Sequence, residues 1–262
     1  MSRRLADLLD RVRKEYVQTM LDHGEVEPYL TAHRVCNTRL WLPGPELAKL
    51  IAEDPKLLSA RASDLIDDDR ERPNPCVGAI VTSNIVAAAL EGLLAVAVNR
   101  EWLDVDSDGR VLVDAHELDS IPSVTGVDYS DAGDFTPTRG RSRLSDIFHA
   151  AEQAYLERLQ DGPHDAYQLA LMVSSDHSIF TPDDLAPLLL ENPLLLGLRA
   201  DDLVEEELFD GDPPAGIIIS AHLAEMLVQQ LLERALEAGA IGHDSQGQPI
   251  LSETDEDSPT VH

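Results

Sequence analysis

The chain contains an internal duplication, which constrains its fold more than any other feature of the sequence. The segments 45–55 and 183–193 align at an offset of 138 residues, and the match continues without a gap to Val113. Identical pairs along it include Leu47/Leu185, Arg61/Arg199, Asp64/Asp202, Gly78/Gly216, Leu93/Leu231 and Gly109/Gly247. The N-terminal segments repeat as well, with Tyr16 matching Tyr155 at an offset of 139. Internal similarity of this kind reports repeated structural units, so the two halves are predicted to share one fold.

The duplication sets the predicted domain boundaries. Copy one, with its N-terminal helix, is predicted to span 1–119, and copy two is predicted to span 143–251. The segment 120–142 between them is rich in Ser, Gly, Pro, Thr and Asp, which is typical of a linker. The chain closes with an acidic tail, 252–262.

Each copy presents the same order of predicted elements. Copy one is expected to contain an amphipathic helix from Leu5 to Met20, a helix over 27–35, a short strand over 40–42, a helix opening at Pro45, a short helix near 60–66, a long helix capped by Thr82, and a hairpin over 105–113. In copy two the second helix covers 165–173, the strand 179–180, the short helix 199–206 and the hairpin 243–251, and Ser220 caps the long helix.

This element order is typical of a winged helix. We therefore predict a mainly α fold with small β-hairpins (α+β), made of tandem duplicated winged-helix domains, each with an extra N-terminal helix. The alternative from the same pattern is an unrelated duplicated α-helical domain that carries a hairpin.

The net charge of −29 limits the solvent conditions and the classes of binding partner expected for this protein. The chain has 49 acidic and 20 basic residues, and its only lysines are Lys14, Lys49 and Lys56. Such a surface is typical of halophiles with a molar-salt cytosol, where screening weakens repulsion between carboxylates. It argues against a basic nucleic-acid coat and against an anionic-membrane binder. Two cysteines and no visible signal peptide favour a cytoplasmic location, and the apolar stretch 77–98 is interrupted by polar residues, so no transmembrane span is expected.

The long helix of copy one carries almost no charged residues, which indicates a protein partner. A helix that is apolar nearly all round is expected to be buried against its own domain or a partner. We expect copy one to bind a partner or form a homodimer through Leu5, Leu9, Tyr16 and Trp102. Basic residues near the N-terminus (Arg3, Arg4, Arg11, Arg13 and Lys14) are interpreted as ordinary surface charge, with a weak phosphate-contacting patch as the alternative.

The acidic turn of copy one has the spacing of a calcium-binding loop. Asp104, Asp106 and Asp108 precede Gly109, but position twelve is Ala115 where such a loop needs a bidentate Glu. The shared feature of the two copies is the turn, so a simple turn is favoured and calcium binding stays open.

The remaining candidate metal-binding and catalytic motifs have even less support in the sequence. His33, Cys36 and Cys76 lack the close spacing of a metal site, and buried structural cysteines are the favoured interpretation. The chain has no nucleophile elbow, phosphate-binding loop or dinucleotide fingerprint, so no enzyme activity, metal or cofactor is predicted.

In architecture, an acidic chain with two predicted winged helices resembles the kleisin-binding (KITE-type) accessory subunits of SMC condensin complexes. The resemblance carries no functional residue over. It implies a non-enzymatic, homodimeric protein-interaction subunit that binds a kleisin-like segment and contacts DNA indirectly or weakly. One alternative is a transcription regulator that binds DNA through Ser220, His222, Gln229 and Arg234 of copy two. A second alternative is a calcium- or metal-binding protein on a duplicated helical scaffold.

Overall fold

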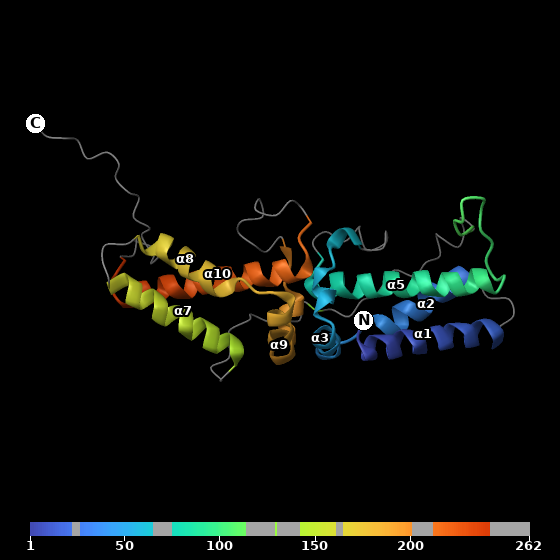
Figure 1. Cartoon of the computed structure of the whole chain (residues 1–262), viewed down its shortest axis with the longest axis horizontal. Coiled ribbons are helices and arrows are strands. Elements are labelled where there is room, and N and C mark those ends of the chain that lie inside the picture. The colour runs from blue at the N-terminus through green and yellow to red at the C-terminus, as the bar shows by residue number, and fades with distance from the viewer. Residues whose placement is uncertain are drawn as a thin grey trace, which may run out of the picture. The chain divides into compact units, whose positions relative to one another are not determined.

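The fold was taken from a computed structural model that describes residues 1–22, 27–64, 75–113, 129, 142–160, 165–200 and 212–241. Figure 1 shows the order of the elements along the chain. The α-helices are α1 (Arg3–Asp22), α2 (Pro28–Leu40), α3 (Gly44–Glu53), α5 (Val77–Asn99), α7 (Arg143–Gln160), α8 (Ala166–Ser178), α9 (Pro182–Glu191) and α10 (Ala215–Glu237). The 3-10 helices are η1 (Pro55–Ser59), η2 (Ala62–Asp64) and η3 (Pro193–Gly197).

The predicted α+β fold with winged-helix hairpins is wrong, because the described residues form an all-α protein without a strand or sheet. Helix α2 continues to Leu40, where a strand was expected, and no strand follows α8 at 179–180. The hairpin at 105–113 is reduced to one isolated bridge, Val105 to Val111, around a tight turn. The second predicted hairpin, 243–251, lies outside the described residues.

The predicted start of the long helices is also wrong. Both begin five residues before the expected caps, α5 at Val77 and α10 at Ala215. Thr82 is fully buried inside α5, and Ser220 lies inside α10. The expected short helix near 60–66 is the single turn η2, and its counterpart falls mostly among residues that are not described.

The helix boundaries follow the sequence repeat closely. The pairs α2 and α8, α3 and α9, η1 and η3, and α5 and α10 begin and end 138 residues apart. The same helices therefore recur in both copies, as the duplication indicates.

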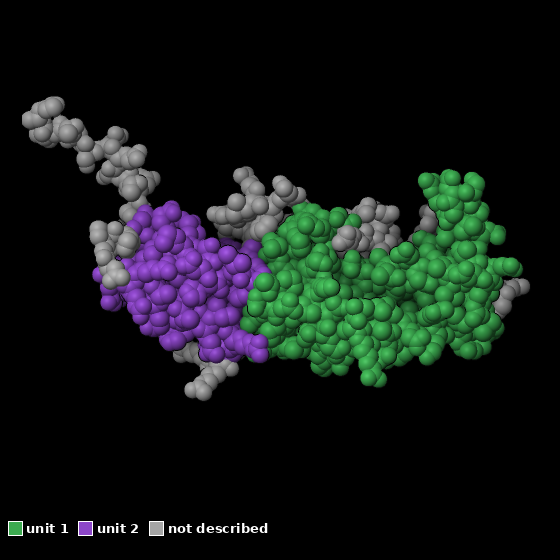
Figure 2. All heavy atoms as spheres, in the orientation of Figure 1, with its two compact units in different colours: residues 1–135, 181–219 green, residues 136–180, 220–262 purple. Residues whose placement is uncertain are grey.

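The chain forms two compact units that cut across the repeats (Figure 2). Unit 1 comprises Met1–Phe135 and Thr181–Ile219, so it includes all of copy one together with α9, η3 and the first residues of α10. Its core takes apolar side chains from each of its long helices, including Leu8, Val12, Ile51, Ile80 and Leu93.

Unit 2 comprises Thr136–Phe180 and Ser220–His262, with a core formed by α7, α8 and most of α10. The buried positions on α10 recur every four residues, at Leu223, Leu227, Leu231 and Ala235, and each is fully inaccessible to solvent. This spacing places them along one face of the helix, which is the face that packs into the core.

Within unit 1 the central segments of the two copies pair reciprocally. The N–H of Val77 donates to the carbonyl of Leu198 at 2.9 Å, and the N–H of Ala215 donates to the carbonyl of Ala60, also at 2.9 Å. Val77 corresponds to Ala215, and Ala60 corresponds to Leu198, at the offset of 138. Each copy thus uses the same surface to contact the other, as in an isologous dimer with approximate twofold symmetry.

Other contacts reinforce this repeat interface, defined as the pairing of residues 60–63 and 76–78 with 198–199 and 212–216. Cys76 and Arg199 form an antiparallel bridge. The Arg61 side chain donates to the carbonyl of Asp212, and the N–H of Ser63 donates to Asp212 Oδ1 at 3.1 Å. Helices α3 and α9, which are equivalent in the repeat, also pack against each other.

Candidate interaction surfaces

The residues predicted to bind a partner lie at the junction of α1 with the rest of unit 1. Leu5 and Tyr16 are buried in the core, 7% and 0% exposed. The Tyr16 hydroxyl donates to the carbonyl of Pro28 at 3.2 Å, and its ring meets the half-buried Trp102 edge-on, with centroids 6.1 Å apart. Leu5 and Tyr16 therefore serve the packing of unit 1, while Leu9 is partly exposed in a groove.

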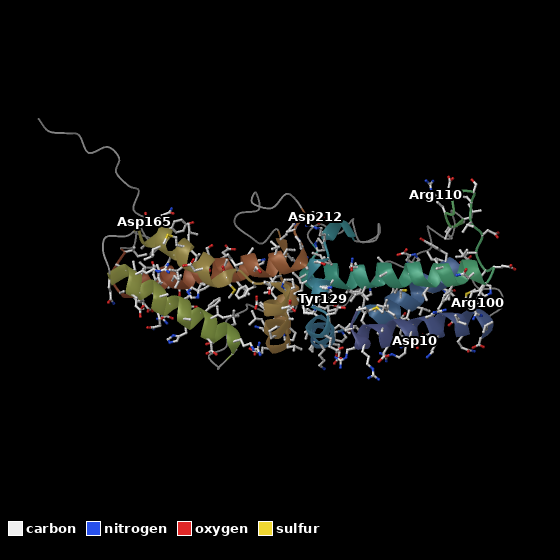
Figure 3. All side chains as sticks on the ribbon, viewed as in Figure 1. Asp10, Arg100, Arg110, Tyr129, Asp165 and Asp212 are labelled. Carbon is white, nitrogen blue, oxygen red and sulfur yellow. The ribbon has the colours of Figure 1, made fainter. Side chains whose placement is uncertain are left out.

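That groove runs between α1 and α5 and is named the α1–α5 groove. It encloses about 270 Å³ and is lined by Leu9, Asp10, Val12, Arg13, Ala88, Ala89, Gly92 and Leu93. A Cβ added at Gly92 would meet no atom within 4 Å, so the groove is open at this residue. Apolar and small side chains make up its floor, and two charged residues of opposite sign, Asp10 and Arg13, are carried by α1 (Asp10 is labelled in Figure 3).

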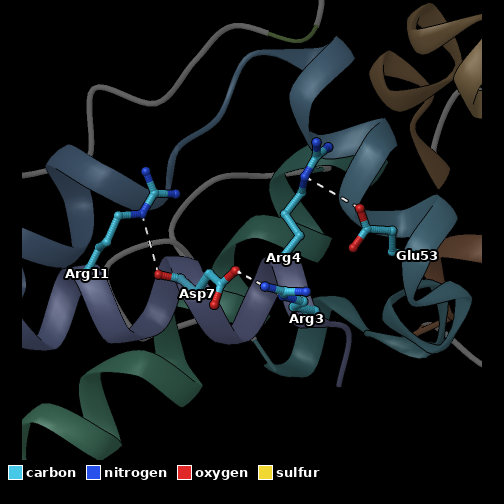
Figure 4. A pocket seen from close by; sticks show the side chains of 5 residues that line it. All are labelled: Arg3, Arg4, Asp7, Arg11 and Glu53. Atoms are coloured by element: carbon cyan, nitrogen blue, oxygen red, sulfur yellow. Dashed lines mark hydrogen bonds and ion pairs between the residues drawn. The ribbon is translucent and has the colours of Figure 1, made fainter.

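The basic residues at the N-terminus line a polar pocket with neighbouring acids (Figure 4). Arg4 Nε lies 3.5 Å from Glu53 Oε1, and Arg3 Nε lies 3.9 Å from Asp7 Oδ2. Arg11 Nε donates to the main-chain carbonyl of Asp7 at 3.4 Å. Because these guanidinium groups already face carboxylates or a carbonyl, the arrangement favours ordinary surface charge over a phosphate-binding patch.

The residues proposed for DNA contact lie on the part of α10 in unit 2. Gln229 is exposed, whereas Ser220 and His222 are half-buried. Arg234 Nε lies 2.7 Å from Glu152 Oε1, and Arg234 Nη1 lies 2.5 Å from Glu237 Oε2. These contacts raise the pKa of Arg234, the Glu237 hydrogen bond most of all. Two carboxylates thus surround the cation that a phosphate would need.

The acidic turn of copy one is stabilised by hydrogen bonds to the side chain of one of its own aspartates. Asp106 Oδ1 accepts the N–H groups of Asp108 at 2.9 Å and of Arg110 at 2.8 Å. Gly109 adopts φ +79°, a left-handed conformation that glycine tolerates best. The described residues contain no group of three or more His, Cys, Asp or Glu side chains placed to hold a metal ion. The geometry shows a turn stabilised by an aspartate, and calcium binding there is not supported by any gathered ligand set.

Both cysteines and His33 are buried. Burial raises the pKa of the Cys36 thiol to about 12 and also raises the pKa of Cys76, so both thiols stay protonated at neutral pH. A protonated, buried thiol is a poor nucleophile and a poor metal ligand.

Sequence reasoning missed Tyr129, which the linker contributes to the core of unit 1 (labelled in Figure 3). The side chain is 7% exposed, and its hydroxyl donates to the carbonyl of Leu42 at 2.6 Å. The same hydroxyl lies 3.1 Å from Thr82 Oγ1, within hydrogen-bonding distance. The available signal was an aromatic residue in a segment otherwise composed mostly of small and polar residues.

Two described helices, α5 and α10, are long and apolar enough to cross a membrane. The most apolar window of α5 is 50% buried inside the protein, and that of α10 is 39% buried. Core helices of soluble proteins meet the same length and composition criterion, so this property alone is weak evidence for a membrane location.

Comparison with known proteins gives no relative, since no family model, curated protein or solved structure matches this chain.

Proposed function

We propose that this protein is a non-enzymatic, cytoplasmic protein-binding subunit that receives an amphipathic helix of a partner in the α1–α5 groove. The observation that carries the proposal is the groove itself, whose lining is mostly apolar in a chain with 49 acidic and 20 basic residues. Glu91 is the only charged residue of α5, and the exposed residues that this helix contributes to the groove, Ala88 and Gly92, are uncharged. Docking of an amphipathic helix into an apolar groove is a recurring mode of recognition.

The side chains of the groove suit a helical ligand. Ala88 and Gly92 are one helical turn apart, and small residues at this spacing allow a second backbone to approach closely. Leu9 supplies larger, partly exposed apolar surface beside them, whereas Leu93 is already buried at the floor of the groove. Full burial of a large apolar side chain contributes about 1.5–3 kcal/mol, so completing the burial of Leu9 contributes part of that amount. Asp10 is already paired with Lys14, whose Nζ lies 2.6 Å from Asp10 Oδ2, so Arg13 is the charged residue of the groove that can fix the direction of the ligand by pairing with a carboxylate.

A partner helix can dock in the α1–α5 groove without any winged helix in the chain. The resemblance to kleisin-binding subunits rested on that fold, which the described residues do not form. What supports a protein partner is the apolar groove together with the acidic surface. A kleisin-like or SMC partner and a homodimer both stay predictions, and the pairing of Arg234 with Glu152 and Glu237 gives the DNA-binding alternative no support.

The test compares a variant whose large side chain blocks the groove with a conservative control variant at the same residue. Gly92→Trp fills the open groove, whereas Gly92→Ala adds a methyl group where no atom lies within 4 Å. The tagged full chain and both variants are purified in high salt from the cells that encode it, and bound proteins are crosslinked and mapped. We expect Gly92→Trp to lose the partner at least tenfold and Gly92→Ala to retain it, with crosslinks to α1 and α5. An SMC ATPase and a kleisin among the bound proteins would support a role as an accessory subunit of an SMC condensin complex.

Two outcomes contradict the proposal. One is equal capture of the same partner by Gly92→Trp and wild type, with circular dichroism showing that both are folded. The other is retention of the wild-type protein in the membrane fraction after a high-salt wash, which would assign the apolar helices α5 and α10 to a bilayer.

A further inference from the structure

A compact site for a tyrosine side chain lies at the start of α5. The tyrosine site is defined by Leu42, Gly78 and Thr82, and all three belong to unit 1. Tyr129 fills it, with the ring against Gly78 and the hydroxyl between the Leu42 carbonyl and the Thr82 hydroxyl. One residue of the linker is thereby held by contacts on both its apolar ring and its polar end.

The ring contact explains why position 78 is a glycine. A Cβ built there would lie 2.7 Å from Tyr129 Cγ and within 2.9 Å of both Cδ atoms, closer than van der Waals contact allows. The ring cannot easily shift away, because its hydroxyl is fixed by the Leu42 carbonyl at 2.6 Å. Any side chain at position 78 would therefore displace the tyrosine.

The polar contacts select a phenol over a plain aromatic ring. Thr82 is fully buried, and Tyr129 is 7% exposed. A phenylalanine in the same place would fill the apolar space but leave the Leu42 carbonyl and the Thr82 hydroxyl without this partner. Buried polar groups that lose a partner carry a desolvation cost, which is how a site discriminates in favour of the hydroxyl.

The tyrosine site adjoins only one of the two reciprocal bonds of the repeat interface. Gly78 follows Val77, whose N–H donates to the Leu198 carbonyl. The equivalent glycine in copy two, Gly216, follows Ala215, which makes the matching bond to Ala60. A Cβ at Gly216 would meet Leu58 at 3.4 Å and Leu185 at 3.5 Å, and it has no closer neighbour. Tyr129 therefore adds a contact beside the Val77 bond, and Gly216 has no equally close contact beside the Ala215 bond.

We propose that Leu42, Gly78 and Thr82 form a phenol-specific binding site whose ligand is the chain's own linker residue Tyr129, and that this ligand locks the Val77 side of the repeat interface. The inference goes beyond the proposed function, since it concerns different residues from the α1–α5 groove. It assigns the linker a role in holding the copies together, in addition to connecting them.

The two reciprocal amides provide an internal control for the test. Hydrogen exchange of the Val77 and Ala215 amides is measured by NMR in the wild-type full chain and in Tyr129→Ala, Tyr129→Phe and Gly78→Ala. We expect exchange at Val77 to accelerate roughly tenfold or more in Tyr129→Ala and Gly78→Ala, and to a smaller degree in Tyr129→Phe, with Ala215 little changed. Equal acceleration at both amides would show that Tyr129 contributes only to global stability and would overturn the inference, as would no change at either.

Chemical rescue tests the phenol specificity separately. p-Cresol added to Tyr129→Ala is expected to restore protection of the Val77 amide, while toluene at the same free concentration restores much less. The same additions to a Gly78→Ala/Tyr129→Ala double variant should have no effect, because the added methyl group occupies the place of the ring. Equal rescue by toluene, or rescue of the double variant, would contradict a phenol site at these residues. If Tyr129→Ala does not fold, the comparison of Tyr129→Phe with wild type at Val77 and Ala215 decides the inference.

Discussion

At the scale of single residues, buried tyrosines carry much of the specific packing. Tyr16, Tyr129 and Tyr155 each bury the ring and donate the hydroxyl to a main-chain carbonyl. Tyr16 and Tyr155 are repeat equivalents, and they reach the equivalent residues Pro28 and Ala166 at the start of the following helix. A phenol suits this role because one side chain supplies a large apolar body and one hydrogen bond.

The buried tyrosines predict a loss of stability in alkali. Burial raises the pKa of all three hydroxyls from 10.0 to about 12. Above about pH 10 the unfolded chain releases tyrosine protons that the folded chain keeps, so the stability contributed by these hydroxyls is fully present below that pH and is lost as the pH rises toward 12. The buried thiols of Cys36 and Cys76, whose ordinary pKa is 9.0, add a fall that begins at lower pH. Urea denaturation from pH 8 to 12 measures this, and Tyr155→Phe should flatten the fall. A free energy of unfolding that is constant up to pH 12 would contradict the burial of these hydroxyls.

Substitutions of Tyr155 are expected to destabilise the protein to different degrees, depending on whether they remove only the hydrogen bond or the ring as well. Its hydroxyl donates to the Ala166 carbonyl at 2.9 Å, and the residue is fully buried. We expect Tyr155→Phe to lower the free energy of unfolding by about 1 kcal/mol, through the lost hydrogen bond. Tyr155→Ala should lower it by roughly 3–5 kcal/mol because it also leaves a cavity. Gln153→Ala, at an exposed position of the same helix, is the control and should be nearly neutral in thermal denaturation.

At the scale of elements, equivalent helices begin in different ways. Helix α9 starts with a capping box, in which Thr181 Oγ1 accepts the N–H of Asp184 and the N–H of Thr181 donates to Asp184 Oδ2 at 3.0 Å. Its equivalent α3 starts after Pro43 and has no side-chain cap. Since α3 and α9 pack together, the cap stabilises one helix of this equivalent pair.

Removing this cap is expected to lower the free energy of unfolding by an amount that depends on pH. We expect Thr181→Ala to lower the free energy of unfolding by about 1 kcal/mol near neutral pH. Hydrogen bonds from Thr181 lower the pKa of Asp184, so the contribution of that carboxylate is present at neutral pH and lost as the pH falls through its folded-state pKa. Denaturation at pH 7 and pH 3 should therefore show a smaller effect of Thr181→Ala in acid. An equal effect at both pH values would mean that Asp184 does not take part in the cap.

The elements also show where sequence reasoning succeeded and failed. Periodicity located the helices well, including the amphipathic face of α1 with Leu5, Leu8, Val12 and Tyr16 buried. It failed at Trp41, because a few apolar residues after a helix look the same whether they form a strand or a helix end. The Asp-Gly signal at 108–109 correctly indicated a tight turn, but a turn needs no sheet around it, and the described residues provide none.

At the scale of the whole molecule, the charge is the dominant property. The net charge of −29 arises from 49 acidic and 20 basic residues, and several of the basic residues are already paired, as Arg39 is with Glu15 at 2.7 Å. The unpaired acidic excess repels itself wherever the folded chain holds carboxylates closer than the unfolded chain does.

This excess predicts stabilisation by salt. We expect the melting temperature to rise markedly as KCl is raised from about 0.1 M to about 1 M, because the Debye length shortens from about 10 Å to about 3 Å. Sucrose at matched osmolality serves as the control, since it stabilises by exclusion without screening charge. A melting temperature that responds equally to sucrose and KCl would remove charge repulsion as the cause and weaken the prediction of a halophilic cytosol.

The sequence by itself determined the duplication, the presence of the helices and the buried face of α1, because these depend on repeated and local spacing along the chain, whereas it misplaced the start of α5 and α10. Only the tertiary structure decided that the copies pair through Val77, Ala215 and their reciprocal carbonyl partners, and that Tyr129 occupies one side of that interface. A reciprocal bond joins residues more than 120 positions apart, and the main-chain groups that form it are the same in every residue type except the missing N–H of proline. Local patterns therefore cannot encode such a bond, which forms only where the tertiary structure brings the two segments together, as it also brings α3 against α9.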